Sequence, residues 1–413
     1  MRKKENYVIV AFVAMIMLLM CFLMSPGAGD MNIWERWMEY VSQYGIIDGY
    51  AMQQDMYPPF ALLVQYLVKY ICPFLSNFAV LRLTNTFFVV LSLLLAYFLF
   101  KDIKVGVLVF SGLFISSNIG YLDVEMAPFL ILAVYFFGRE KFWLSGLFFT
   151  LLSLIKFQPL IIAPFILIYF INIYDSQQQK YKLSIKMKKL LQISIPVIII
   201  WAMVCIIYRG EPLKMLRSAL FSSGASIAPN ALNLGWIIQF VLEKFKPDTF
   251  GALNNGYISI IWNAPKGYLS FKYIFFILYF ITVLLLTMHK EKNSQLVLRY
   301  AIIGYTVYFL FNSGVHENHL FLAAFLMILL YVLEPTKTNY GRAVMYIFIF
   351  NMNLVIFYGL TGALPIYRVI DGLIDPTLIL AVFNVIYLSA ICFNMILETI
   401  YRSDKFLGRQ FLA

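Results

Sequence analysis

The segment LLQISIPVIIIWAMVCIIY, from Leu190 to Tyr208, contains no charged residue over 19 positions. A helix of about 20 apolar residues spans the hydrocarbon core of a bilayer, so this segment predicts a transmembrane helix. Comparable apolar runs occur on both sides of it along the chain. They lie at Val8–Met24 and near Leu83–Phe100, Val105–Ser117, Met126–Phe137, Phe142–Ile155, Leu160–Ile173, Ile274–Met288, Tyr300–Phe311, Leu320–Leu333, Val344–Leu360 and Thr377–Leu397. Because several runs are short, we expect their helices to extend into the flanking polar residues.

The composition agrees with a polytopic membrane protein. Of the 413 residues, 62% are hydrophobic and 13% are charged, against about 25% charged residues in a soluble domain. The mean hydropathy is +0.80. No polar block is large enough to fold separately, so residues 1–413 are predicted to form a single membrane domain. The four cysteines are scattered, without the spacing of a metal site or a disulfide framework.

The net charge of +11 fits basic cytoplasmic loops better than a nucleic-acid partner, because Lys and Arg concentrate on the cytoplasmic side of membrane proteins. Phe60–Phe74 is ambiguous, since it is apolar but follows two prolines and contains Gln65 and Lys69. If this segment lies at the outer surface as an interfacial helix, the predicted inside carries 20 Lys+Arg and 8 Asp+Glu, and the outside 12 and 13. This model has twelve spans and both termini in the cytoplasm.

The N-terminus allows two interpretations. MRKKE followed by an apolar run resembles a signal peptide, with SPGAG as its cleavage region. The run from Val8 to Met24 is long for a signal peptide, and we therefore expect an uncleaved first span. The model then has two large outer loops, residues 25–81 and 209–273, and an active site would face outward.

Polar residues gather at the predicted outer ends of the spans. The candidate site residues are Asp30, Asp55, Tyr57, Asp123, Glu125, Lys156, Gln158, Asn230, Asn233, Trp236, His316 and Glu317. Structural roles compete with functional ones. Asp30 could be a solvated loop residue, and Asp123 and Glu125 could cap a helix. Lys156 could extend to the interface, and Trp34, Trp37 and Tyr57 could anchor the chain at the membrane surface.

Several common kinds of site are not supported. His316 and His319 in VHENH are three residues apart, whereas zincin histidines are four apart on one helical face. The sequence contains no phosphate-binding Gly-rich loop and no Ser–His–Asp arrangement. We predict no cofactor, and a divalent metal is not indicated.

An outward carboxylate facing cations and amides suits transfer of a sugar from a lipid-phosphate donor. The phosphate is already a good leaving group, so no general acid is required. A carboxylate base accepts the proton of the acceptor hydroxyl, and cations or amide donors hold the phosphate as charge develops.

These residues resemble the GT-C glycosyltransferases, membrane enzymes that use polyprenyl-phosphate sugars. GDMNIWERWMEY is similar to the first outer loop of the dolichyl-phosphate-glucose glucosyltransferases, in which an Asp at the position of Asp30 is the catalytic base. QDMYPPF resembles their DYPP motif, KFQPL their K-x-Q segment, and VHENH their HEK motif. PNALNLGW resembles an N-A-x-N-x-W stretch of related bacterial enzymes. The motifs follow the family order from Gly29 to about Leu330.

Two positions depart from the family pattern. Met56 separates Asp55 from Tyr57, and Asn318 occupies the place of the family lysine, so a phosphate contact would come from His316 or Lys156. The resemblance implies an inverting hexosyltransferase with a GT-C-like fold of about twelve spans plus interfacial helices in the first outer loop. Its partners would be a polyprenyl-phosphate hexose (glucose is expected), a glycan or glycolipid acceptor, and membrane lipids.

Size and the Lys/Ile-rich composition favour a bacterial inner-membrane enzyme with its site on the periplasmic or extracellular side. Phage-encoded O-antigen glucosyltransferases, which modify lipopolysaccharide, are of this general kind. Two alternatives remain. An O-antigen polymerase would be expected to have arginine-rich outer loops, and a lipid-linked sugar flippase should show inverted repeats and broken midplane helices.

Overall fold

The computed structural model describes residues 26–53, 57–175, 180–221, 226–362, 366–368 and 375–401. The predicted first span, the question of its cleavage, and Asp55 lie outside these residues.

Helices dominate the described chain. The first half contains α2 (Asp30–Met52), α3 (Pro59–Ile71), α4 (Asn77–Phe100), α5 (Ile103–Ile119), α6 (Asp123–Gly138), α7 (Phe142–Ser153), α8 (Ala163–Ile168) and α9 (Met187–Ile207). The second half contains α10 (Glu211–Phe221), α11 (Leu234–Phe245), α12 (Pro247–Phe250), α13 (Lys272–Thr287), α14 (Ser294–Phe311), α15 (Phe321–Leu333), α16 (Lys337–Tyr358) and α17 (Pro376–Tyr401). Four short 3-10 helices are η1 (Gln158–Ile162), η2 (Lys266–Leu269), η3 (Glu317–Leu320) and η4 (Ile366–Arg368).

Six of the described helices are long and apolar enough to cross a membrane: α4, α9, α13 (together with η2), α14, α16 and α17. The apolar runs were therefore correctly interpreted as helices of a membrane protein, whereas the number of twelve spans stays a prediction. Several helices extend beyond their runs, as expected, among them α5, α6 and α14, whereas α7 and α15 end within theirs. Helix α4 begins at Asn77, where the Ser76 hydroxyl accepts a hydrogen bond from Ala79 N at 3.2 Å, a typical N-cap.

The prediction of a continuous helix over the apolar run Leu160–Ile173 is wrong at the C-terminal end of the run. The chain forms η1 and α8, leaves the helix after Ile168, and enters a hairpin of β1 (Ile171–Asp175) and β2 (Lys180–Ile185). The two strands are antiparallel, with Ile171 opposite Ile185. Isoleucine and tyrosine, which are common in this segment, favour strands, and pairing with β2 supplies the backbone hydrogen bonds that a helix would have supplied. The protein is thus not entirely α-helical.

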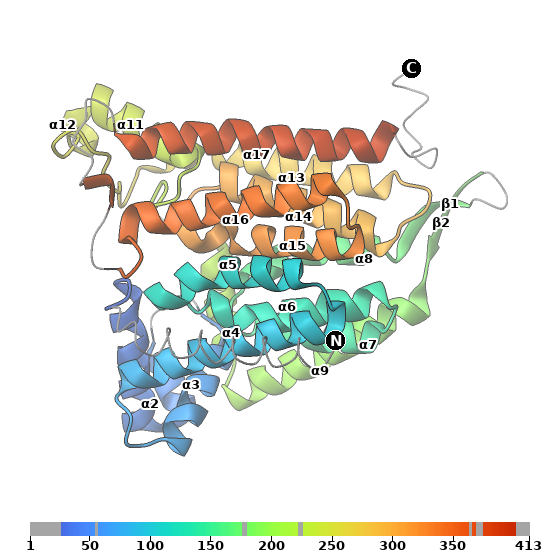
Figure 1. The fold of residues 1–413 in the computed structure, drawn as a ribbon, viewed down its shortest axis with the longest axis horizontal. Coiled ribbons are helices and arrows are strands. Elements are labelled where there is room, and N and C mark those ends of the chain that lie inside the picture. The colour runs from blue at the N-terminus through green and yellow to red at the C-terminus, as the bar shows by residue number, and fades with distance from the viewer. Residues whose placement is uncertain are drawn as a thin grey trace.

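The long helices run side by side and define two ends of the molecule (Figure 1). Helices α2, α3, α11 and α12 lie at one end, and the β1–β2 hairpin lies at the other. We call these the loop end and the hairpin end. Helices α2, α3, α11 and α12 come from the two segments predicted as outer loops, residues 25–81 and 209–273.

The basic connections meet at the hairpin end. Lys189 forms an ion pair with Glu140 at 2.7 Å, which joins the start of α9 to the turn after α6. Lys292 donates to Ile171 O at 2.9 Å, and Lys290 lies 4.7 Å from the ring centroid of Tyr174. The segments that the charge distribution assigned to one side are therefore neighbours in space.

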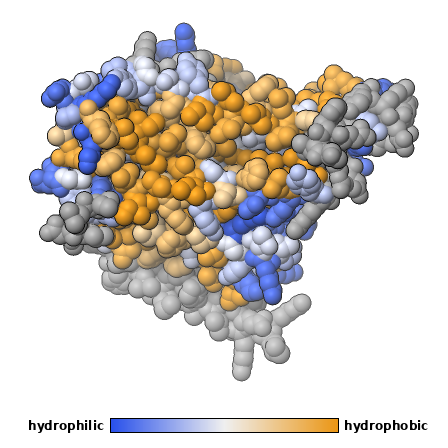
Figure 2. All heavy atoms as spheres, turned by 90° about the horizontal axis from the view of Figure 1, so that it is seen from above, coloured by the Kyte–Doolittle hydropathy of each residue, from blue (hydrophilic) through white to orange (hydrophobic). Residues whose placement is uncertain are grey.

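The surface between the two ends is apolar. Hydrophobic atoms cover a broad area in the middle of the face in Figure 2, with hydrophilic residues toward its left end. Exposed side chains such as Ile198 on α9, Ile277 on α13 and Ile386 on α17 contribute to this kind of surface. Helix α15 lies inside the bundle, since its residues from Phe321 to Tyr331 are all buried. Lipid would cover an outer surface of this kind.

Cysteine labelling can test the sides of the membrane. In a variant whose four native cysteines are replaced, single cysteines at Glu39 or Asn255, both exposed at the loop end, should react with an impermeant thiol reagent added to intact cells. A cysteine at Ser184, exposed in the hairpin, should react only after the cells are opened. Labelling at Ser184 in intact cells would overturn the predicted orientation.

Candidate active site

The N-terminus of α2 is fixed against the turn that joins α5 to α6. Ala28 N donates to Ile119 O at 2.8 Å, and the Trp34 indole donates to Gly120 O at 3.2 Å. Asp30 is the first residue of α2. These bonds hold the Asp30 carboxylate beside the turn, and Asp123 directly follows this turn at the start of α6.

Gly120 allows this close approach. Its φ is +87°, and a Cβ at this position would lie 2.1 Å from Met31 Sδ. Glycine adopts a positive φ without steric cost and leaves room for the neighbouring backbone. The sequence NIGYLD therefore brings α2 and the start of α6 together.

Three aromatic residues form one wall of the site. The Trp34 and Trp37 rings are 4.5 Å apart, and Tyr57 lies 5.1 and 5.2 Å from them, all in edge-to-face geometry. Both tryptophans are 1% exposed. They are therefore core residues that support Tyr57, and the role of surface anchors considered for them does not fit their burial.

A buried ion pair lies next to this wall. Lys156 Nζ is 2.9 Å from Asp123 Oδ2, with side-chain exposures of 2% and 0%. Asn318 Nδ2 donates to the same oxygen at 2.8 Å. Lys156 Nζ also lies 5.5 Å from the ring centroid of Tyr57. Lysine carries three N–H donors, so the bond to Asp123 orients the ammonium group without using all of them.

A second buried carboxylate is hydrogen-bonded to a residue of the turn between α5 and α6. Glu317 is buried, and its Oε1 accepts hydrogen bonds from the Tyr121 hydroxyl and from the Tyr358 hydroxyl at 3.1 Å. Asn230 donates to the Tyr358 oxygen at 3.2 Å. The backbones of Asn230 and His316 pair as an antiparallel bridge, which ties the second outer loop to this cluster.

Asp30 interacts electrostatically with the Lys156–Asp123 ion pair and with Glu317. Burial raises the pKa of Asp30 from 3.8 to about 6. The negative charges of Glu317 and Asp123 also raise this pKa, whereas His316 and Lys156 lower it. Among the described residues, the Asp30 carboxylate has no hydrogen-bond or ion-pair partner. It is thus a partly buried carboxylate of increased basicity with both oxygens free.

Several buried oxygens in this region also lack partners within the described ranges. They are Asp123 Oδ1, Glu317 Oε2, Asn318 Oδ1, Glu125 Oε2 and Gln65 Oε1. Buried polar atoms are usually hydrogen-bonded, and an exception calls for a physical explanation. All five can accept hydrogen bonds, and the hydroxyl groups of Tyr305 and Ser116 also lack partners within the described ranges.

Glu125 lies slightly apart from the Asp30 cluster. It is fully buried in the first turn of α6, and Gln65 of α3 donates to its Oε1 at 3.4 Å. This contact links α3 to α6. Gln158, two residues after Lys156, begins η1 and is half-buried.

Asn233 and Trp236 use their polar atoms within the fold. Asn233 Oδ1 caps α11 by accepting from Trp236 N at 3.2 Å, and Asn233 Nδ2 donates to Phe309 O at 2.8 Å. The Trp236 indole donates to Thr377 Oγ1 at 2.8 Å. These two residues hold the second predicted outer loop on the helical bundle, and they position Asn230, which precedes them in the chain.

The structure therefore brings together Asp30, Tyr57, Asp123, Lys156, Asn230, His316 and Glu317. Tyr121, Tyr358 and the contact of Asn318 with Asp123 were not predicted from the sequence. Tyr121 could have been noticed from its place two residues before Asp123. Tyr358 gave no signal, since it ends a long apolar helix far along the chain.

No protein-family model and no curated protein matches this sequence. In the described part of the chain, no group of three or more His, Cys, Asp and Glu side chains could hold a metal ion. The function is therefore inferred from the site itself.

Proposed function

We propose that this protein is an inverting hexosyltransferase of the GT-C type that moves a sugar from a polyprenyl phosphate to a glycan or glycolipid hydroxyl at the outer face of a bacterial membrane. The observation that carries the proposal is Asp30: a partly buried carboxylate of raised pKa, free of partners among the described residues, next to a buried lysine. The resemblance of its flanking sequence to the GT-C first outer loop supports the same assignment.

Asp30 would act as the general base. It takes the proton of the acceptor hydroxyl while the acceptor oxygen bonds to the anomeric carbon of the sugar. The bond between that carbon and the phosphate oxygen breaks at the same time, and polyprenyl phosphate leaves with the electron pair. One displacement inverts the anomeric centre. A pKa of about 6 leaves Asp30 charged at neutral pH and more basic than an ordinary carboxylate, which favours proton transfer.

Lys156 would bind the phosphate of the donor. Its ammonium group is fixed by Asp123 and keeps N–H donors for a phosphate oxygen. His316 is the second candidate for this contact because its side chain is exposed, affects the pKa of Asp30, and carries a ring N–H donor for a phosphate oxygen. Cations placed where charge develops on the leaving group lower the barrier.

The free acceptor oxygens of Asp123 and Glu317 suit the hydroxyl groups of a hexose. A sugar has several O–H donors. Two of its hydroxyl groups, one on each carboxylate oxygen, would provide hydrogen bonds to atoms that are otherwise buried without partners. Rigid partners such as Tyr121 and Tyr358 hold the other oxygen of Glu317, so the free oxygen keeps a fixed direction.

The direct test is transfer by purified protein in detergent. Labelled undecaprenyl-phosphate glucose and mannose are supplied separately with lipid-linked glycan or lipopolysaccharide acceptors, with and without EDTA. We expect an acceptor-dependent product and release of undecaprenyl phosphate, including in EDTA. Donor binding without any release of undecaprenyl phosphate, combined with movement of the intact donor across vesicle membranes, would instead identify a flippase.

The activity should depend on pH through Asp30. Because its pKa is about 6, the carboxylate is charged above this pH and becomes protonated as the pH falls through it. A protonated base accepts no proton, so kcat/KM should fall about tenfold for each pH unit below the pKa. The measurement is a rate profile from pH 4.5 to 8.5. An acid limb centred near pH 4 would show that Asp30 is not the titrating base.

A further inference from the structure

A pocket at the hairpin end is separate from the candidate active site. It has a volume of about 290 Å³ and lies between the C-terminal ends of α4, α6 and α15. Its walls are apolar, with Phe100, Val134 and Val332 among the lining residues. Arg139, which directly follows α6, is at the rim. The pocket is therefore located where three membrane-level helices meet the polar boundary.

Arg139 is exposed and has no carboxylate partner among the described residues. Its guanidinium carbon lies 4.3 Å from the ring centroid of Tyr135, which also lines the pocket. Each acid near the rim is already engaged. Glu140 binds Lys189 and Tyr169, and Glu334 binds Arg299.

Further positive charge surrounds the rim. Lys101 follows Phe100 directly and caps the C-terminus of α4, and Lys141 is two residues after Arg139. The nearby Asp102 carboxylate accepts a hydrogen bond from Lys104 N at 2.8 Å. The pocket thus combines an apolar interior with Arg139 at its rim and Lys101 and Lys141 close to it in the sequence, against one carboxylate, that of Asp102, which has no basic partner among the described residues.

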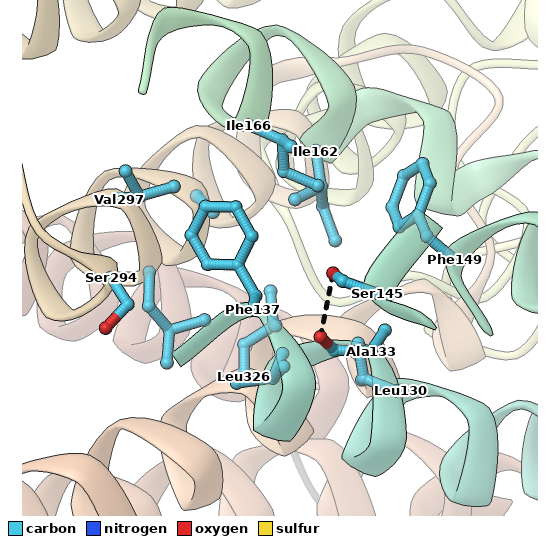
Figure 3. Close-up of a pocket in the computed structure, with 13 residues that line it drawn as sticks. Leu130, Ala133, Phe137, Ser145, Phe149, Ile162, Ile166, Ser294, Val297 and Leu326 are labelled. Carbon is cyan, nitrogen blue, oxygen red and sulfur yellow. Dashed lines mark hydrogen bonds between the residues drawn. The ribbon is translucent and has the colours of Figure 1, made fainter. Parts of the chain in front are cut away.

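A second pocket, between α6, α7, α8 and α14, has no charged residue at its rim (Figure 3). Its volume is only about 40 Å³, and the Ser145 hydroxyl at its edge is satisfied by Ala133 O at 2.9 Å. It has no charged lining residue. This second pocket is a packing gap between helices, whereas the pocket at Arg139 has the features of a binding site.

We propose that the pocket at Arg139 binds an anionic membrane phospholipid, with the phosphate headgroup on Arg139 and the upper part of an acyl chain between α4, α6 and α15. Arginine matches phosphate oxygens with a planar fork of N–H donors. Basic pockets between membrane helices at the basic end of a protein are suited to acidic headgroups. The site is distinct from the active site and does not depend on the proposed reaction.

The test compares two phospholipids on the full-length protein. Purified protein in a neutral detergent is titrated with dioleoyl-phosphatidylglycerol or dioleoyl-phosphatidylcholine, and bound lipid is counted by native mass spectrometry. We expect phosphatidylglycerol to bind about fivefold more tightly or better, since one basic residue at an anionic membrane surface contributes about 1 kcal/mol. Arg139→Ala should reduce its affinity to that of phosphatidylcholine.

Two further variants separate the charge from the cavity. Lys188→Ala removes an exposed charge from the same end on α9 and should leave the preference unchanged. Val332→Trp fills the pocket and should weaken the binding of both lipids. Equal affinity for the two lipids in the unmodified protein would overturn the proposal. So would a preference that survives Arg139→Ala, or one that Lys188→Ala reduces as much as Arg139→Ala does.

Discussion

Asp30→Asn is expected to lower the rate of sugar transfer by about 10²- to 10⁴-fold, the usual effect of losing a general base. Asparagine keeps the shape of the side chain but accepts no proton at neutral pH. The substitution leaves intact the contacts that fix the start of α2, because those come from Ala28 and Trp34. Donor binding should therefore change little, and the loss should appear in kcat. Single-turnover transfer with bound donor measures it.

Two control variants test whether the loss of activity is specific to Asp30. Asp48→Asn changes another aspartate of α2, which is 62% exposed and pairs with Arg209 at 3.1 Å; its activity should stay near that of the unmodified protein. Asp55→Asn tests the rival base suggested by the sequence. Turnover above a tenth of normal in Asp30→Asn, together with an inactive Asp55→Asn, would move the base to Asp55.

Measuring the stability of Asp30→Asn should exclude unfolding as the cause of its lost transfer activity. The pKa of Asp30 rises from 3.8 to about 6 on folding, so the charged form is disfavoured in the folded protein. Its contribution to stability therefore decreases as the pH rises from about 4 to 6 and stays low at higher pH. Asparagine is neutral throughout. At pH 8 the variant should unfold at the same temperature as the unmodified protein or at a higher one.

Lys156→Ala is expected to abolish donor binding and to destabilise the protein. The ion pair with Asp123 is almost fully buried, and removal of one partner leaves an uncompensated charge, at a cost of about 3–5 kcal/mol. The donor should also lose its phosphate contact. Denaturant unfolding measures the first effect, and equilibrium binding of undecaprenyl-phosphate glucose in detergent measures the second.

A double variant separates these two effects. Lys156→Met with Asp123→Asn removes both charges and should recover most of the lost stability, whereas donor affinity should stay low. Lys189→Ala is the matched control, because Lys189 pairs with Glu140 at a similar distance but is exposed. Its effect on stability should be below about 1 kcal/mol. Normal donor affinity in the double variant would remove Lys156 from the donor site.

The site was only partly predictable from the sequence. Ionisable residues next to apolar runs are energetically costly at membrane level and are usually functional. This rule selected Asp30, Asp123, Lys156 and Glu317 from the sequence. Their grouping could be expected from topology alone, since each lies at the same predicted end of a span. The pairing of Lys156 with Asp123 was not expected, and neither was the role of Asn318, which supports Asp123 at the place where the family has a lysine.

The helical membrane character of the protein, and the grouping of segments at each end, could be predicted from the amino-acid sequence. Apolar runs such as Leu190–Tyr208 have nowhere else to bury their side chains, and the basic loops that were assigned to one side meet through contacts such as Lys189 with Glu140. These are properties of single segments and of their charge, so a single sequence carries them.

The contacts that build the site, and the replacement of a helix by strands after Ile168, depend on the three-dimensional packing of distant segments. Glu317 is bound by Tyr121 and Tyr358, which are 196 and 41 residues away in the chain, and the strand at Ile171 depends on its partner around Ile185. Hydrogen bonds between distant segments depend on distances and angles that no local pattern of residues encodes. The raised pKa of Asp30 likewise depends on the tertiary structure, because it arises from burial and from charged residues that three separate segments bring around it.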